Sequence, residues 1–248
     1  MGKVAACGLD RGEGLGLTSL LLLPGLLCDA SIWAAQSRDL STRVTISIPE
    51  YRSATSLEEM AAITLDLVDG PIAVAAHSMG ARVAFEMWRK APERITRLAL
   101  LDFWVGPVVA GEYDKRKVLT DMSADEGIEA VAKTWVASMV NPDRVNDQPL
   151  IDQLRKMVCT YTPDQHAGQV QALLNRADLW KLLPTITVPT LIALGREDPW
   201  RSVDQHREMA EAIPGARLEV IADCGHMSPA ERPRDVTNLL EEWLDDGN

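Results

Sequence analysis

Short, unbroken runs of apolar residues recur along the chain, and segments with helical spacing separate them. Because the apolar positions in these runs are continuous rather than alternating, they are typical of parallel strands that helices cover on both faces. The runs occupy residues 17–25, 43–48, 71–76, 97–102, 189–195 and 216–222. The helical segments occupy residues 56–68, 82–91, 202–213 and 234–244.

The segment 82–91 illustrates how such a helix packs on a sheet. Val83 and Met87 share one face, as do Ala84 and Trp88, and this i, i+4 spacing is that of an amphipathic helix. The alternation of strands and helices predicts an α/β fold with a mostly parallel, doubly wound sheet. In such sheets, ligand sites lie at the carboxyl ends of the strands.

The alternation is interrupted between about residues 106 and 184, where the spacing is helical and no strand-like run occurs. Prolines, which are favoured near helix starts, divide this stretch into pieces. They are Pro107, Pro142, Pro149, Pro163 and Pro184. We therefore predict a core domain formed by residues 1–105 and 185–248, with residues 106–184 inserted as a helical cap (lid) over the strand ends.

The composition is that of an ordinary globular protein, with 248 residues of which 46% are hydrophobic and 25% are charged. The formal net charge of −11 would be repelled by nucleic acid phosphates and by anionic lipid surfaces, so neither is an expected partner. No apolar stretch approaches the ~18–20 residues that span a bilayer. The sequence leaves the oligomeric state open.

The four cysteines, Cys7, Cys28, Cys159 and Cys224, have neither the spacing of zinc ligands nor that of a disulfide framework. Cys7 precedes the apolar stretch 17–27, which is the opposite order to that of a secretory leader, so no leader is expected. The expected state is therefore reduced thiols in a cytoplasm. No metal or organic cofactor is indicated.

Ser78 stands where the apolar run 71–76 gives way to the helix 82–91, in the sequence AHSMG. Turns at such a junction usually carry Gly, Asn or Asp, so a serine needs a separate reason. Ser78 could cap the helix by accepting a backbone N–H. Alternatively, it could be a nucleophile presented on a tight turn between small neighbours.

A nucleophilic serine needs a general base within hydrogen-bond reach, and the base needs a third group to hold it. His226 lies in the loop ADCGHMSPAERP directly after the last predicted strand, which would bring it to the carboxyl edge of the sheet. The side chain of His77, next to Ser78, is expected to point elsewhere. His166 and His206 lie within predicted helices, where a lid-facing or solvated role is expected.

Two carboxylates compete for the role of orienting the base. Asp198 follows a predicted strand in the sequence GREDPW, although an Asp in this context could also form a local turn. Asp102 ends the preceding predicted strand and is the alternative acid. Glu197 and Asp223 are weaker candidates.

Backbone N–H groups at strand ends can stabilise negative charge that develops on a substrate oxygen. Met79 opens the helix after Ser78, so its N–H has the helix dipole behind it. Gly25 allows a tight turn after the first predicted strand and frees the N–H of Leu26, whereas Pro24 has no N–H to donate. The Leu26 and Met79 amides are therefore the candidate oxyanion hole.

Together, the sequences AHSMG, LPGLL, GREDPW and CGH, in the chain order Ser, Asp, His, resemble the α/β-hydrolase fold superfamily. The similarity is to its lid-bearing serine hydrolases and esterases, and it covers nearly the whole chain. It implies a catalytic triad of Ser78, His226 and Asp198. It also implies an oxyanion hole formed by the Leu26 and Met79 amides, beneath a helical cap.

Two positions depart from the family pattern. Ala76 replaces the first glycine of GxSxG, and alanine allows the close turn if its φ angle stays negative. Pro24 replaces the histidine of the usual HG sequence, which changes the path of that loop. The pair of strands common at the start of the family's fold is poorly marked in residues 3–16.

The resemblance implies acyl transfer to Ser78, and the expected substrate is a small or medium hydrophobic carboxylic ester. Thioesters, lactones or a carbon–carbon bond would use the same triad, and a non-catalytic ligand-binding protein of this fold is the alternative from another class. Trp and Met at helical spacing also pack ordinary cores, so both roles stay open for the candidate pocket residues. These candidates are Leu27, Trp104, Trp135, Met139, Tyr161 and Met227.

Overall fold

The computed structural model describes residues 19–246 and contains a six-stranded sheet in which every strand runs parallel to its neighbours. The strand order is β2-β1-β3-β4-β5-β6, and this confirms the predicted mostly parallel α/β sheet. The strands are β1 Ser19–Leu23, β2 Thr45–Ser47, β3 Ile72–His77, β4 Ile95–Leu101, β5 Thr190–Gly195 and β6 Arg217–Ile221. The weakly marked segment 3–16 lies outside the described residues.

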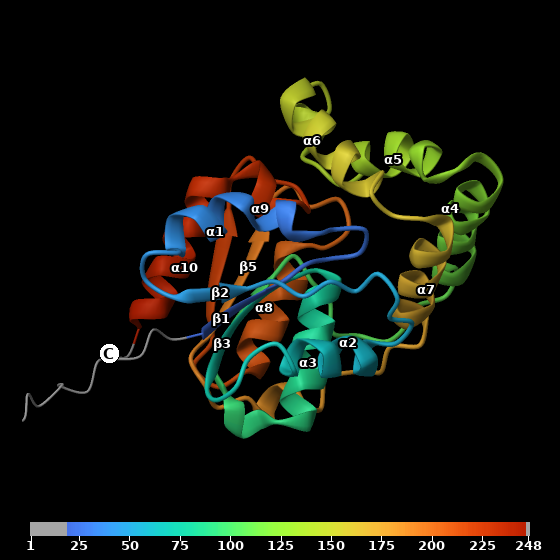
Figure 1. The fold of residues 1–248 in the computed structure, drawn as a ribbon. Helices are drawn as coiled ribbons and strands as arrows, with labels where there is room; N and C mark the ends of the chain where they lie inside the picture. Colours follow the sequence, from blue (N-terminus) through green and yellow to red (C-terminus); the bar gives the residue numbers. More distant parts are fainter. Residues whose placement is uncertain (1–18, 247–248) are drawn as a thin grey trace, which may run out of the picture.

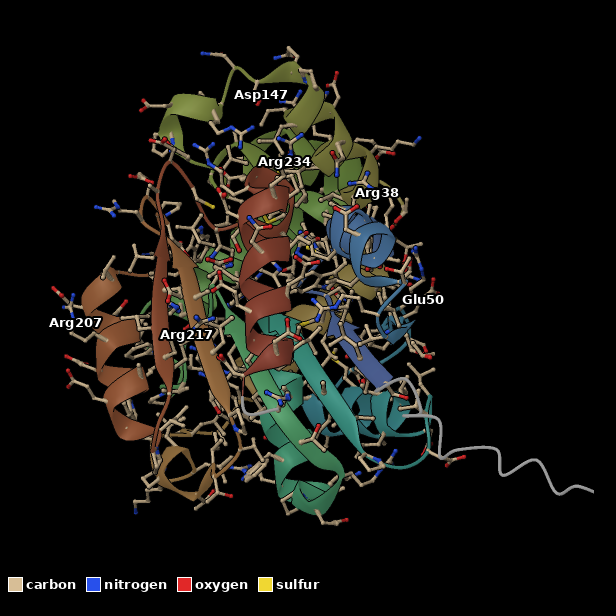
Figure 2. The ribbon with its side chains drawn as sticks, turned by 90° about the vertical axis from the view of Figure 1, so that its left-hand side faces the viewer. Arg38, Glu50, Asp147, Arg207, Arg217 and Arg234 are labelled. Carbon is tan, nitrogen blue, oxygen red and sulfur yellow. The ribbon has the colours of Figure 1, made fainter. Side chains whose placement is uncertain are left out.

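Helices cover both faces of the sheet (Figure 1). On one face lie α1 Ala34–Leu40, α9 Ser228–Glu231 and α10 Pro233–Asp245, and on the other α2 Leu57–Leu65, α3 Met79–Lys90 and α8 Val203–Ala212. Charged side chains such as Arg38, Arg207 and Arg234 lie on the outer surfaces of these helices (Figure 2). The pattern of apolar positions did not predict α1, because seven residues are too few for a helical period to be recognised.

Four further helices, α4 to α7, lie beyond the carboxyl ends of the strands, at the top and right of Figure 1. They are α4 Glu112–Glu126, α5 Ile128–Ala137, α6 Gln148–Val158 and α7 Pro163–Leu174. Gly127, with a φ angle of 89°, separates α4 from α5, a conformation that glycine adopts without strain. These helices match the helical spacing of the sequence, while the division into a core and a cap stays a prediction.

Short 3₁₀ helices complete the described elements: η1 Ala30–Trp33, η2 Pro92–Arg94, η3 Pro142–Arg144 and η4 Leu183–Thr185. Three of these four contain a proline in the first turn. This is the position where the missing N–H costs nothing.

The centre of the sheet brings two loops together at its carboxyl edge. The chain passes from β1 to β2 on one side and then returns to β3 on the other, so the loops after β1 and β3 are neighbours. This reversal of strand order is where open α/β sheets form their ligand sites. Gly80 makes the approach possible, since a Cβ atom there would lie 2.5 Å from the carbonyl oxygen of Leu23.

Candidate active site

Ser78 occupies a sharp turn between β3 and α3. Its φ angle is 53°, a left-handed conformation that costs a non-glycine residue about 1–3 kcal/mol. The Ser78 N–H donates to the carbonyl oxygen of Leu101 at 2.9 Å, and this bond ties the turn to the end of β4. The interpretation of Ser78 as a helix cap is wrong, because its side chain makes no cap hydrogen bond.

The Ser78 hydroxyl instead lies beside the imidazole of His226. Its Oγ atom is 2.9 Å from His226 Nε2, and His226 Nδ1 is 2.7 Å from Asp198 Oδ2. The Asp198 carboxylate can only accept, so it fixes the imidazole proton on Nδ1. Nε2 is then the acceptor for the serine proton. The structure thus joins the three side chains in one hydrogen-bonded chain.

The loop after β6 is anchored where it carries His226. The backbone N–H of His226 donates to the carbonyl oxygen of Met139 at 2.8 Å. The carboxylate of Glu231 accepts hydrogen bonds from the N–H groups of Gly225 and Met227, the two neighbours of His226, and from that of Asn141. The imidazole therefore rests on a loop that is held on both sides.

Asp198 uses its two oxygens for different purposes. Oδ1 accepts the backbone N–H groups of Trp200 at 2.7 Å and Arg201 at 3.2 Å, which is a local turn of the kind expected for Asp in a loop. Oδ2 accepts from His226. The two roles considered for Asp198 in the sequence are thus combined, since the turn orients the carboxylate toward the imidazole.

The two charges of this pair stabilise each other. Burial alone would lower the pKa of His226, but the Asp198 carboxylate and its hydrogen bond outweigh burial and raise that pKa. Burial would likewise raise the pKa of Asp198, but His226 and the local hydrogen bonds lower it. An imidazolium formed by taking up the serine proton would therefore be stabilised in place.

Asp102 lies close by but makes other hydrogen bonds. It is fully buried, and its oxygens accept from the N–H of Gly195 at 2.9 Å and from the hydroxyl of Ser228 at 2.5 Å. Burial raises the pKa of Asp102 to about 8. His77 is its third neighbour at 3.8 Å, and the ring of His77 donates to the carbonyl oxygen of His226. The imidazole of His226 hydrogen bonds Asp198 instead.

His206 and the two weaker acid candidates are hydrogen bonded or paired elsewhere. Glu197 accepts from the N–H of Cys224, and Asp223 pairs with Arg232 on the surface. His206 is completely buried and accepts from the N–H of Phe103, so the expectation of a solvated role for it is wrong. Burial lowers the pKa of His206 to about 4.

The loop after β1 lies against Ser78. Leu26 and Met79 each line a hollow that Ser78 also lines, and their N–H groups donate to no acceptor within residues 19–246. Leu27 has a φ angle of 55°, and its N–H donates to the side chain of Gln169 on α7 at 2.9 Å. Ala76 lies in β3 without a positive φ angle, as its place in the turn requires.

Three adjoining hollows lie beside Ser78, between the strand ends and helices α4, α5 and α7. Their volumes are about 240, 70 and 50 Å³. Ser78 and His226 line the two smaller ones. Trp200 and Arg116 line all three and so connect the largest hollow to the serine.

The candidate pocket residues divide into two groups. Trp104, Trp135, Met139 and Met227 line at least one hollow. Leu27 and Tyr161 line none of the three. The side chain of Leu27 is fully buried, and Tyr161 donates its hydroxyl proton to the carbonyl oxygen of Cys28 at 2.6 Å.

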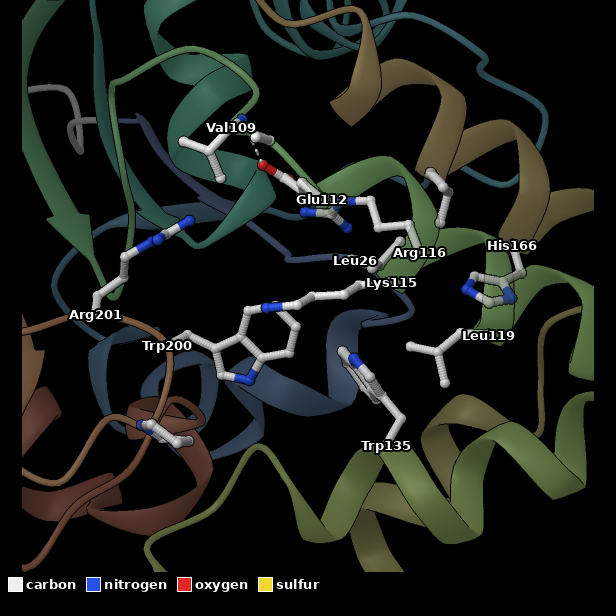
Figure 3. Close-up of a pocket in the computed structure, with 13 residues that line it drawn as sticks. Leu26, Val109, Glu112, Lys115, Arg116, Leu119, Trp135, His166, Trp200 and Arg201 are labelled. Carbon is white, nitrogen blue, oxygen red and sulfur yellow. Dashed lines mark hydrogen bonds and ion pairs between the residues drawn. The ribbon is translucent and has the colours of Figure 1, made fainter.

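The charged residues that line these hollows, and Trp200 among them, were not predicted from the sequence. Trp200 carried a signal, because it stands two residues after Asp198 at a strand end. The arginines carried none, since they come from separate segments with no motif between them. They are Arg82, Arg116, Arg176 and Arg201. His166 on α7 also lines the largest hollow (Figure 3).

Two further properties of residues 19–246 concern cofactors and membranes. Within this range, no three His, Cys, Asp or Glu side chains are grouped as metal ligands. Nor does the range include a helix with the length and apolar character to cross a bilayer.

The sequence is similar to those of known hydrolases along most of its length. A family model described as "Alpha/beta hydrolase family" matches residues 20–239. The chain belongs to the alpha/beta hydrolase family. Among curated proteins, it is 25% identical over 238 residues to the pimeloyl-[acyl-carrier protein] methyl ester esterase of Nitrosomonas europaea, covering 90% of this chain and 94% of that protein.

Solved structures of other members have the same fold. A thermophilic esterase from Thermogutta terrifontis, solved with malate bound, superposes with a TM-score of 0.84 and 27% identity over 93% of this chain and 90% of that one. An enol-lactonase from Burkholderia xenovorans LB400 superposes with a TM-score of 0.82 and 23% identity, covering 95% and 94% of the two chains. With such relatives, the chain is a hydrolase of the alpha/beta type.

Proposed function

We propose that this protein is a serine hydrolase that cleaves a small or medium carboxylic ester through an acyl-enzyme on Ser78. The observation that supports this most directly is the chain of hydrogen bonds from Ser78 Oγ to His226 Nε2, 2.9 Å, and from His226 Nδ1 to Asp198 Oδ2, 2.7 Å. This arrangement supplies a nucleophile, a base and an orienting acid.

In the first half of the reaction, His226 takes the hydroxyl proton as Ser78 Oγ attacks the ester carbonyl carbon. The resulting oxyanion accepts hydrogen bonds from the Leu26 and Met79 amides, and Met79 lies at the positive end of α3. The tetrahedral intermediate collapses as His226 gives its proton to the leaving alcohol. The acyl group is then bonded to Ser78.

In the second half, water attacks the acyl-enzyme while His226 takes one of its protons. Collapse of the second intermediate releases the carboxylic acid and returns the proton to Ser78. Asp198 keeps the imidazole oriented and stabilises its charged form in both halves. No metal or organic cofactor takes part in these steps.

The residues that line the hollows fit the acyl chain of a small or medium ester. Trp135, Met139 and Met227 supply apolar surface beside Ser78, and the largest of the three adjoining hollows, at about 240 Å³, has room for a small ligand only. The esterase activities named for the relatives support an ester as the substrate class. A thioester or a lactone would meet the same three side chains.

The test combines a fluorophosphonate probe with a chain-length series of aryl esters, thioesters and lactones. We expect the wild-type protein to be labelled and Ser78→Ala to be unlabelled, with kcat lower by about 10⁶. Ser41→Ala is the matched control, since Ser41 lies exposed after α1 and bonds only a local carbonyl. Equal labelling of Ser78→Ala, or no labelling and no turnover in the wild type, would contradict the proposal and favour a non-catalytic ligand-binding role.

A further inference from the structure

Four arginines from four separate segments line the hollow that contains Ser78 and His226. Arg82 lies on α3 and Arg116 on α4, while Arg176 follows α7 and Arg201 follows β5. The chain as a whole carries a net charge of −11. A concentration of positive charge in one small hollow of an acidic protein calls for a specific negative partner.

One carboxylate neutralises part of this charge. Glu112 accepts two hydrogen bonds from Arg176, at 2.6 and 2.5 Å, and one from Arg116 at 2.9 Å. These bonds join α4 to the segment after α7 and are a sufficient structural role for Glu112, Arg116 and Arg176. They also lower the pKa of Glu112 to about 2, even though burial opposes this shift.

The other two guanidinium groups have no carboxylate partner among residues 19–246. Arg82 is 3% exposed and donates to the carbonyl oxygens of Ala177 and Gly106. The guanidinium carbon of Arg201 lies 5.5 Å from the centre of the Trp104 ring, and the Arg201 side chain forms no ion pair in the described part of the chain. Burial lowers the pKa values of Arg82 and Arg201, while Glu112, which forms no ion pair with either, acts in the opposite direction.

Arg201 is also tied to the catalytic arrangement proposed above. Its backbone N–H donates to Asp198, and its side chain lines both the hollow at Ser78 and the largest hollow. Figure 3 shows Lys115 extending across the largest of the three hollows toward Trp200, so a further cation beside Arg116 and Arg201 reaches the same space. The apolar side chains of Leu26 and Trp135 line this hollow too.

We propose that the substrate carries a carboxylate at a distance from the ester, and that Arg201 binds this carboxylate in the hollow beside Ser78. The inference rests on the proposed ester hydrolysis and narrows its substrate class to half-esters of small dicarboxylic acids. A guanidinium presents paired N–H donors that match a carboxylate. The apolar side chains contact the methylene chain between the ester and the carboxylate. The hydrophobic character predicted for the substrate therefore applies only to this methylene chain.

The test compares monomethyl esters of straight-chain dicarboxylic acids with the methyl esters of monocarboxylic acids of equal length. For the wild-type protein we expect kcat/KM to be at least about 30-fold higher for the half-ester of the best length. A charge-assisted hydrogen bond in a desolvated site stabilises a bound carboxylate by enough to account for this 30-fold ratio. Raising the salt concentration should reduce the preference, because the anion is recognised by charge.

Two variants identify the binding group. Arg201→Gln should lower kcat/KM for half-esters about 10- to 100-fold more than it lowers kcat/KM for neutral esters, while Arg201→Lys should restore part of this difference. Arg207→Gln is the matched control, because it removes the same charge from the outer surface of α8 (Figure 2). Thermal unfolding of each variant separates a loss of binding from a loss of stability.

A binding measurement keeps this inference separate from the proposed function. Calorimetry compares Ser78→Ala with the double variant Ser78→Ala/Arg201→Gln, using the monomethyl half-ester as ligand. Ser78→Ala should bind the half-ester, and the added Arg201→Gln should weaken this binding by a similar factor. If neutral esters are hydrolysed as well as half-esters and Arg201→Gln changes nothing, the inference is overturned while the serine hydrolase stands. If no ester is turned over and the fluorophosphonate does not react, the proposed function fails, and equal binding by both calorimetry variants would overturn the inference as well.

Discussion

Replacing each of the two buried acids with asparagine provides a strict test of which one orients His226. In Asp198→Asn, the amide oxygen must stay where Oδ1 now accepts the N–H groups of Trp200 and Arg201. The amide NH₂ group is then directed at His226 Nδ1, which can no longer carry the proton. The proton moves to Nε2 and faces the hydroxyl of Ser78, so the base is lost.

The expected loss in kcat for Asp198→Asn is on the order of 10⁴, because the imidazole is held in the wrong tautomer. At 1.36 kcal/mol for each tenfold change, this corresponds to about 5.4 kcal/mol of activation free energy. In Asp102→Asn, the amide oxygen can still accept the N–H of Gly195, and Ser228 can turn its hydroxyl to accept from the NH₂ group. Burial raises the pKa of Asp102 and so disfavours its charged form, which is why the loss of this charge in asparagine should cost little.

We therefore expect Asp102→Asn to keep kcat within about tenfold of the wild type, or about 1.4 kcal/mol. The assay is steady-state hydrolysis of a p-nitrophenyl ester by both variants near neutral pH. Thermal unfolding is recorded in parallel so that a misfolded variant is recognised. A kcat that is nearly unchanged in Asp198→Asn and strongly reduced in Asp102→Asn would refute the reasoning and make Asp102 the acid.

Three further predictions follow from the same contacts. Since the pKa of His226 is raised above its ordinary value of 6.5 and the base must be neutral, kcat/KM should fall as the pH drops through a midpoint above 6.5; a pH–rate profile with a lower midpoint would contradict this. Glu231→Ala removes the acceptor of three backbone N–H groups around His226, so unfolding should cost about 3 kcal/mol less, with a Tm lower by roughly 6–12 °C, and kcat should fall; Glu231→Gln should lie between this variant and the wild type. Gly80→Ala places a Cβ atom 2.5 Å from the carbonyl oxygen of Leu23, so denaturant titration should show a stability lower by about 1–3 kcal/mol, and an unchanged midpoint would mean that the turn relaxes freely.

The general fold could be predicted from the sequence because its signals are local. Continuous apolar runs predict strands that are buried on both faces, and the observed strand β3 Ile72–His77 is buried along its whole length. The positions of Ser78, Asp198 and His226 at strand ends were also predictable, because the ends of parallel strands share one edge of the sheet. Which acid contacts His226 could not be predicted, since Asp102 and Asp198 both follow a strand at that edge.

The sequence by itself determined the α/β fold, the serine turn and the places of Ser78, Asp198 and His226 after predicted strands. Each of these depends on residues that are neighbours in the chain. Only the tertiary structure decided the partner of His226 and the charge of the hollow beside it. Arg82, Arg116, Arg176 and Arg201 lie far apart in sequence and belong to no motif, and they meet because α3, α4 and the segments after α7 and β5 converge on one strand edge. Electrostatic interaction depends on distance through space, and that distance exists only once the chain has folded.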